Sequence, residues 1–192
     1  ALVSSSPDDG SLMLQRTDSD RFVPFLRPYR GPWKAGNWTS DPELGTYLEG
    51  RLAGGRYAGI GEFHIFDAAL VDTPQVKRVV ELAIQRDLFL HIHSDAKPVR
   101  ALFALEPRLK ILWAHAGMTE PPETVRDMLD TYHGLWTEVS FRAGDIAPGG
   151  TLSPEWRAVF VTHKDRFLVG TDTYVTPRWS EYRGLKIGRA HV

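Results

Sequence analysis

The chain has 192 residues, of which 42% are hydrophobic and 24% charged, a composition typical of a soluble globular domain. Its formal net charge of -1 gives no general attraction to nucleic acid or to an anionic membrane, and no apolar run reaches the roughly 18 residues of a membrane span. Cysteine is absent, which excludes a disulfide framework and a thiolate metal site. We therefore expect a cytoplasmic protein with neither nucleic acid nor membrane as a partner.

The first part of the chain predicts strands that alternate with helices. Residues 1–6 read as a strand, and a Pro-Asp-Asp-Gly turn then opens a helix over 11–20. A second strand covers 22–26 in spite of Pro24, since parallel barrel strands tolerate proline near a bend. Residues 41–52 begin with Asp-Pro and carry apolar side chains at helical spacing, which predicts the next helix.

A long loop over 27–43, rich in glycine, proline and tryptophan, separates that strand from that helix. In barrel enzymes such strand-to-helix loops usually shape the substrate pocket. The alternative is that Trp33 and Trp38 fill a small core beneath the loop. A guanidinium can clamp a carboxylate in two places, so arginines near strand ends favour a small carboxylated or cyclic substrate. The candidate substrate-binding residues are Arg27, Tyr29, Trp33 and Arg142.

Four apolar or β-branched runs end in a residue that can bind a metal. The carboxyl ends of parallel strands meet at one edge of a sheet, so these residues should lie close together. Helices predicted over 73–86, 97–105 and 123–133 fit between the runs as crossovers. The runs are GEFH with Glu62, HIHSD with His93, WAHAG with His115 and GTD with Asp172.

The strand 88–93 alternates, which places His91 and His93 on one face with Phe89. A histidine there can be a metal ligand or a hydrogen-bonded core residue. Glu62 shares its face with His64 in the same way. A buried carboxylate needs a cation, and that cation can be a metal, a lysine or an arginine.

The last part predicts a strand over 135–141 that ends in Arg142, a loop over 143–154 able to move as a lid, and a helix over 156–164. The final strand, over 166–174, closes on Asp172. The fold class predicted is α/β, an incomplete (β/α)8 barrel of the TIM type. By this count strands two to eight are present, and the first strand and the last helix are missing.

The four motifs, in this order and at barrel spacing, resemble the amidohydrolase superfamily of metal-dependent hydrolases. The resemblance is closest to the amidohydrolase-2 branch, which also contains decarboxylases. In that superfamily the barrel carries HxH on strand one, Lys or Glu on strand four, His on strands five and six, and Asp on strand eight. The resemblance implies that Glu62, His93, His115 and Asp172 are metal ligands. It also implies that Asp172 is the general base and that His115 is a ligand or an acid/base catalyst.

The HxH of the first strand is not found, so the resemblance implies a chain truncated at both ends. Reading His91-Ile92-His93 as that motif would leave too few strands to close a barrel. Residues 1–186 form one partial metal-dependent hydrolase domain by this interpretation. Residues 187–192, IGRAHV, resemble a translated sequencing adapter and are interpreted as a non-native tail, the alternative being a natural one.

Imidazole and carboxylate ligands suit a divalent metal, with Zn²⁺ preferred and Mn²⁺, Fe²⁺ or Co²⁺ also compatible. The expected function is hydrolysis of a C–N or C–O bond in a small-molecule substrate by a metal-activated water. Two alternatives stay open: a nonoxidative decarboxylase or lyase on the same metal site, and an inactive barrel fragment whose apparent ligands are core residues. The parent protein is expected to be the enzyme, the fragment itself is expected to be inactive because the first strand and its ligands are missing, and a homo-oligomer is compatible with the sequence.

Overall fold

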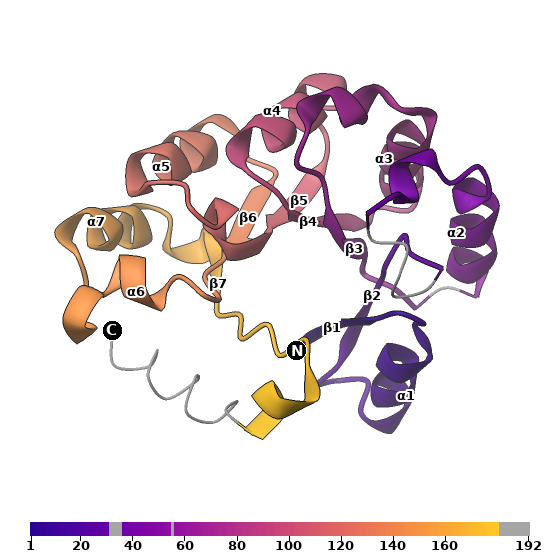
Figure 1. The fold of residues 1–192 in the computed structure, drawn as a ribbon, viewed down its shortest axis with the longest axis horizontal. Coiled ribbons are helices and arrows are strands. Elements are labelled where there is room, and N and C mark those ends of the chain that lie inside the picture. Colours follow the sequence, from indigo (N-terminus) through magenta and orange to yellow (C-terminus); the bar gives the residue numbers. More distant parts are fainter. Residues whose placement is uncertain (31–35, 55, 181–192) are drawn as a thin grey trace.

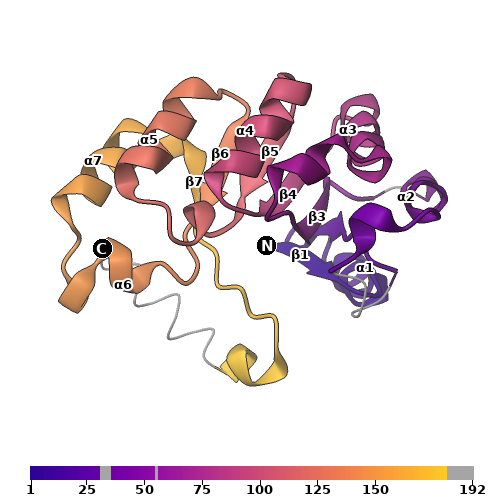
Figure 2. The same cartoon turned by 45° about the horizontal axis from the view of Figure 1, so that its top comes forward.

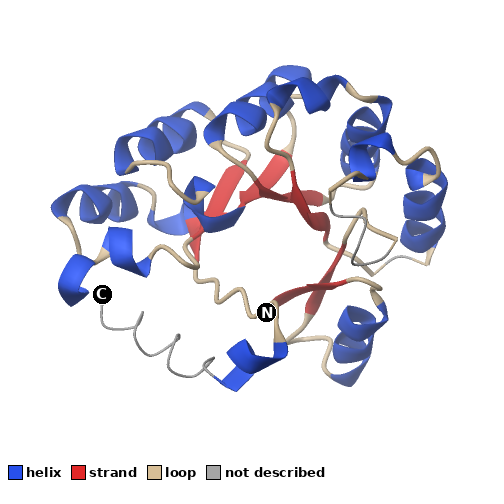
Figure 3. Cartoon of the chain, viewed as in Figure 1, coloured by secondary structure: helices blue, strands red, loops and turns tan. Residues whose placement is uncertain are grey.

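The computed structural model describes residues 1–30, 36–54 and 56–180. Within them, one seven-stranded sheet has the order β1-β2-β3-β4-β5-β6-β7, and every neighbouring pair is parallel. The sheet curls into an inner wall with helices outside it (Figures 1 and 3), which confirms the predicted incomplete (β/α)8 barrel. The strands are β1 (Leu2–Ser5), β2 (Val23–Leu26), β3 (Gly59–His64), β4 (Phe89–His93), β5 (Lys110–Trp113), β6 (Leu135–Glu138) and β7 (Phe167–Leu168).

Helices connect consecutive strands along the outer face, as the turned view also shows (Figure 2). The α-helices are α1 (Asp9–Thr17), α2 (Leu44–Ala53), α3 (Pro74–Gln85), α4 (Ala96–Leu105), α5 (Pro122–Thr131), α6 (Ala143–Ile146) and α7 (Pro154–Thr162). Short 3₁₀ turns are η2 (Trp38–Ser40), η3 (Ala68–Asp72), η4 (Ala114–Gly117), η5 (Pro148–Gly150) and η6 (Lys164–Arg166). No helix in this described part combines the length and apolar character that crossing a bilayer demands.

Helix α3 shows how local sequence sets an element. The hydroxyl of Thr73 accepts a hydrogen bond from the backbone N–H of Val76, and Pro74 occupies the first turn, where its missing N–H costs nothing. Val79 and its neighbours on the same stripe are buried against the sheet. Full burial of one such valine contributes about 1.5–3 kcal/mol, so packing rather than helix propensity holds this element.

The alternation predicted for β4 is confirmed. Leu90 and Ile92 are fully buried in the core beneath the helices, whereas Phe89, His91 and His93 are only partly buried on the other face of the sheet. The inward face therefore carries the histidines.

Trp38 belongs to the core beneath its loop. It is 1% exposed, its ring packs edge-on against Phe63 at 5.0 Å, and its Nε1 donates to the carbonyl of His64 at 3.0 Å. The structure therefore favours the alternative in which Trp38 fills a small core beneath the loop and does not shape the substrate pocket. Trp33 and the tail 187–192 lie outside the described residues.

Two predicted strands were too long at their carboxyl ends. β6 ends at Glu138 because the chain turns there, with Phe141 at a φ of 63°, a conformation that no strand contains. β7 ends at Leu168, and Asp172 follows in a loop with a φ of 41°. The predicted lid loop after β6 was also partly wrong, because it contains α6 and η5.

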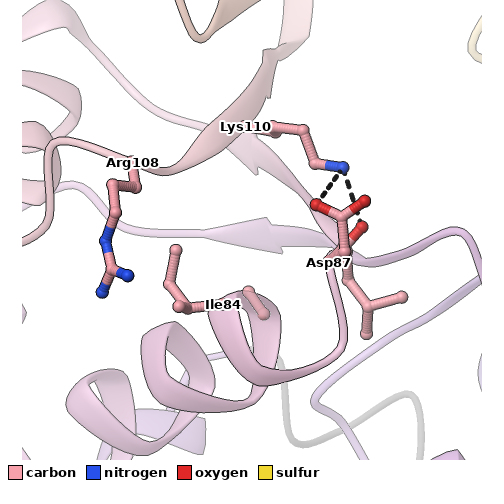
Figure 4. Close-up of a pocket in the computed structure, with 6 residues that line it drawn as sticks. Ile84, Asp87, Arg108 and Lys110 are labelled. Carbon is pink, nitrogen blue, oxygen red and sulfur yellow. Dashed lines mark hydrogen bonds and ion pairs between the residues drawn. The ribbon is translucent and has the colours of Figure 1, made fainter.

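A hollow of about 210 Å³ lies at the other end of the strands (Figure 4), lined by Ala83, Ile84, Asp87, Leu88, Arg108 and Lys110. Asp87 precedes β4 and Lys110 begins β5, and their Oδ1 and Nζ atoms form an ion pair at 2.7 Å. Barrel enzymes do their chemistry at the carboxyl ends of the strands. We therefore assign this hollow to the face that stabilises the fold.

Candidate metal centre

The structure brings the four predicted metal ligands together at the carboxyl ends of the strands. Nδ1 of His93 lies 3.0 Å from Oε1 of Glu62. Nε2 of His115 lies 3.7 Å from the same oxygen and 3.9 Å from Oδ2 of Asp172. Four residues from four βα units thus meet in one cluster, although their binding of a metal stays a prediction.

His115 reaches the cluster from a left-handed turn after β5. His115 and Ala116 have φ values of 57° and 46°, and Gly117 follows at 73°. Left-handed backbone is costly for residues with a Cβ, so the surrounding structure must hold the turn in place.

Arg142 holds that turn. Its Nη1 donates to the carbonyls of His115 and Ala116 at 3.2 and 3.0 Å, and its Nη2 donates to the carbonyl of Glu120 at 2.8 Å. Its Nε donates to Asp145 at 3.0 Å, and the side chain is only 3% exposed. Arg142 was predicted to bind substrate, but all three of its nitrogens are engaged by the protein. The geometry favours a role in positioning His115.

Glu138, at the end of β6, tethers the ring of His115. Its Oε1 lies 2.8 Å from Nδ1 of His115 and accepts the backbone N–H of the same residue at 2.6 Å. Ser140 joins them, with its Oγ 2.7 Å from the same Nδ1. Nε2 of His115 is buried and has no hydrogen-bond partner among the described residues. A carboxylate on one imidazole nitrogen and a free second nitrogen is the usual arrangement of a metal-binding histidine.

The ionisation of this pair follows from its contacts. Burial lowers the pKa of His115, but the Glu138 carboxylate at Nδ1 and the negative charge of nearby Glu62 outweigh it and raise the pKa to about 10. Burial raises the pKa of Glu138, but contacts with His115 and Ser140 outweigh it and lower the pKa to about 2. Burial likewise raises the pKa of Glu62, but the nearby His115 ring and the hydrogen bond with His93 outweigh it and bring the pKa below its ordinary value. Without a bound cation, protonated His115 compensates the carboxylates.

Asp172 is placed by the loop after β7. Arg178 donates to the carbonyls of Asp172 and Thr171 at 3.2 and 3.4 Å. A Cβ at Gly170 would overlap the carboxylate of Glu138, so only glycine lets the chain pass so close. Burial, together with the charge of Glu62, raises the pKa of Asp172. The close approach to Glu138 explains why the first residue of the GTD motif is glycine.

A second cluster adjoins the first. Glu62, His64 and His93 each offer one ligand atom, and these atoms all lie within 4.8 Å of one another. The hydroxyl of Tyr29 lies 3.0 Å from Nδ1 of His64 and accepts the backbone N–H of His64 at 2.9 Å. Tyr29, predicted to bind substrate, is 2% exposed and contacts His64 instead. Arg27 donates from Nε to Ser4 Oγ at 3.2 Å.

Three residues of the site were not predicted as functional: Glu138, Ser140 and His64. A signal existed for Glu138, since a carboxylate inside the apolar run LWTEVSF requires a partner. His64 shares the predicted inward face with Glu62, which placed it correctly without giving it a role. Nothing in the local sequence points to Ser140.

The donor set fits a divalent cation. It consists of imidazole nitrogens and carboxylate oxygens, which suit Zn²⁺, Mn²⁺, Fe²⁺ and Co²⁺. One of these nitrogens, Nε2 of His115, is buried between two carboxylates and accepts or donates no hydrogen bond within residues 1–30, 36–54 and 56–180. A cation there would satisfy the nitrogen and both carboxylates at once.

Comparison with known proteins agrees with this geometry. Residues 39–189 match the family model described as Amidohydrolase, which covers well over half of the chain. No curated protein and no solved structure matches the chain. The family match spans β3 and β4, which carry Glu62 and His93, and the segments after β5 and β7, which carry His115 and Asp172. The chain belongs to the amidohydrolase family.

Proposed function

We propose that this chain carries the catalytic site of a metal-dependent hydrolase that cleaves a C–N or C–O bond in a small substrate. One observation carries the proposal: Nε2 of His115 is buried between Glu62 and Asp172, with no hydrogen-bond partner in the described part of the chain, while Nδ1 is tethered to Glu138. Membership of the amidohydrolase family supports the same activity. We take Zn²⁺ as the preferred cation because of the donor set.

Each residue then has a distinct role. Glu62, His93, His115 and Asp172 hold the cation, and Glu138 keeps His115 in the tautomer whose Nε2 is a free ligand. A divalent cation supplies Lewis acidity, which lowers the pKa of a water molecule and polarises the scissile carbonyl. Asp172 accepts the proton of the attacking water at a carboxylate oxygen and returns it to the leaving group.

Exposed aromatic rings border the site on two sides. Phe66 is 64% exposed and meets His93 edge-on at 5.8 Å. Phe141 is 42% exposed and meets His115 edge-on at 5.7 Å. Aromatic rings beside the ligand histidines favour a substrate with a flat or apolar part. Arg27 can supply the positive charge that a carboxylated substrate needs.

The first experiment measures cation binding by the chelator-treated chain. Isothermal titration with Zn²⁺, Mn²⁺ and Co²⁺ should show tight binding that His115→Ala and Asp172→Asn weaken at least tenfold. His163→Ala is the matched control, since Nε2 of His163 pairs with Oδ1 of Asp130 at 3.2 Å and His163 precedes β7, whereas the proposed ligands lie toward the carboxyl ends of the strands. Cation affinities that are equal in all four proteins would refute the proposed site.

A second experiment separates hydrolysis from the decarboxylase alternative. The metal-loaded chain is incubated with a panel of small amides, esters and aromatic acids, and products are identified. Release of amine or alcohol supports the hydrolase, whereas release of CO₂ from an aromatic acid supports a decarboxylase or lyase on the same residues. Metal binding without turnover on either class would support the inactive alternative.

A further inference from the structure

We propose that Arg178 is a positioning residue for Asp172, and that the ring of Phe141 couples the position of Asp172 to that of His115. This inference rests on the proposed metal-dependent function, since it explains how the last of the four proposed ligands is held in place. Arg178 lies six residues after Asp172 and reaches back to the loop that carries it.

Asp172 needs support from outside its own backbone. It has a φ of 41°, a left-handed conformation that is costly for a residue with a Cβ. Its Oδ2 lies 3.9 Å from Nε2 of His115, which is too far for a hydrogen bond to fix the loop. Arg178 supplies the fixed points, because Nε donates to the carbonyl of Asp172 at 3.2 Å and Nη2 to that of Thr171 at 3.4 Å. One planar guanidinium thus holds two consecutive carbonyls of the loop.

Aromatic rings hold the guanidinium of Arg178 in turn. Its central carbon lies 4.3 Å from the ring centroid of Phe141 and 5.9 Å from that of Tyr174. A cation within about 6 Å of an aromatic face is attracted by the ring. The same Phe141 ring meets His115 edge-on at 5.7 Å. Phe141 therefore contacts a proposed ligand on one side and the support of another ligand on the other.

These contacts join the loops after β6 and β7. Phe141 directly follows Ser140, whose Oγ lies 2.7 Å from Nδ1 of His115. The segment that orients the His115 ring therefore also carries the ring on which Arg178 packs. Loss of either Arg178 or the Phe141 ring should let Asp172 move relative to His115.

Arg166 offers a matched control. Its Nε and Nη2 donate to the carbonyls of Leu135 and Tyr132 at 2.6 and 2.7 Å, and its guanidinium lies 5.0 Å from the ring centroid of Trp136. Arg166 thus makes the same two kinds of contact as Arg178. It makes them at the start of β6, and the proposed ligands lie toward the carboxyl ends of the strands. Arg166→Gln should therefore lower stability without changing the site.

The test uses the full chain with three measurements: Zn²⁺ affinity by titration calorimetry, the visible absorption of bound Co²⁺, and NMR order parameters of residues 171–174 without metal. Arg178→Gln and Phe141→Leu should each weaken Zn²⁺ binding about 10–100-fold, shift the Co²⁺ absorption and lower the order parameters. Arg178→Lys should also weaken binding, because an ammonium lacks the planar fork. Phe141→Tyr, which keeps the ring, and Arg166→Gln should leave all three measurements unchanged. Circular dichroism verifies that each variant is folded.

A double variant tests the coupling. Arg178→Gln combined with Phe141→Leu should bind Zn²⁺ no more weakly than Arg178→Gln alone, because both changes break one chain of contacts. Additive losses, or a Phe141→Leu variant that behaves like the unmodified chain, would show that Phe141 does not couple the two loops.

The remaining outcomes separate the inference from the proposed function. If Arg178→Gln keeps the Zn²⁺ affinity and the order parameters, the positioning role is wrong and the proposed function stands. If Arg166→Gln weakens binding as much as Arg178→Gln, the effect is general destabilisation and the inference fails. If the unmodified chain binds no cation, the proposed function fails, and the order parameters alone decide whether Arg178 holds the loop of Asp172.

Discussion

Glu138 holds His115 by both its ring and its backbone, since the same Oε1 lies 2.8 Å from Nδ1 and 2.6 Å from the backbone nitrogen. The contact joins the end of β6 to the turn after β5. The orientation of Nε2 therefore depends on a residue that is not itself a proposed ligand.

Glu138→Gln should weaken cation binding about 10–100-fold, because the amide keeps the shape but loses the charge that holds the Nδ1 proton. Titration calorimetry measures the change. Glu123→Gln is the control, since Glu123 is exposed in the first turn of α5. Equal affinity in Glu138→Gln and the unmodified chain would show that the tether does not matter for binding.

Cation binding should release protons near neutral pH. In the metal-free chain the pKa of His115 is raised to about 10, so the ring is protonated at pH 7–8, and a cation must displace the Nε2 proton. Calorimetry in buffers of different ionisation enthalpy should show release of about one proton, and the apparent affinity should fall as pH falls. Binding heats that do not depend on the buffer would contradict this assignment.

The same ionisation should affect stability without a cation. The pKa of His115 is above its ordinary value of 6.5, so its contribution to the free energy of unfolding is complete below pH 6.5. That contribution should be lost as pH rises toward 10. Urea unfolding of the metal-free chain between pH 6 and pH 10 measures it, with His115→Asn as the reference. An identical pH dependence in both proteins would exclude His115 as the source.

Gly170→Ala should disturb the site from the far side of Glu138. The added Cβ would overlap the Glu138 carboxylate, so the variant should lose about 1–3 kcal/mol of stability and bind the cation more weakly. Gly144→Ala is the matched control, because a Cβ there meets no atom within 4 Å. Thermal unfolding and metal titration should separate the two variants. Equal stability and equal cation affinity in the two variants would show that the loop after β7 shifts enough to accommodate the added Cβ.

Arg142→Gln should destabilise the fold by about 2–4 kcal/mol, because three carbonyls lose a charged donor in a buried place. Arg100→Gln removes an exposed pair with Asp127 and should cost less than about 1 kcal/mol. Urea unfolding compares them. A substrate-binding role for Arg142 would instead raise KM with stability unchanged, which is the outcome that would overturn the positioning role.

Periodicity predicted the inward face of β4, which carries His91 and His93. This face follows from alternation, which is a property of neighbouring residues. The ends of β6 and β7 were predicted less well. Glu138 accepts the backbone N–H of Ser140 at 2.7 Å, and this turn ends β6 before Phe141. Such a turn depends on contacts that alternation does not encode.

Arg142 and Tyr29 show the other limit of sequence reasoning. Both were predicted at the site, and both contact it, but each hydrogen-bonds to a histidine of the site instead of facing open space. The partner of Tyr29 is His64, 35 residues further along the chain. Whether a polar side chain meets substrate or supports a ligand is decided by such distant packing, which no local pattern contains.

The strands lie in the sheet in the order in which a ribosome would make them. Each new strand can therefore pair with the strand made just before it, and the sheet can grow by one unit at a time during synthesis. Glu62 and His93 are made early, His115 gains its tether only when Glu138 has been added, and Asp172 comes last. A cation that needs all of them can bind firmly only after synthesis is nearly finished, so metal capture would mark the end of folding and could not guide its start.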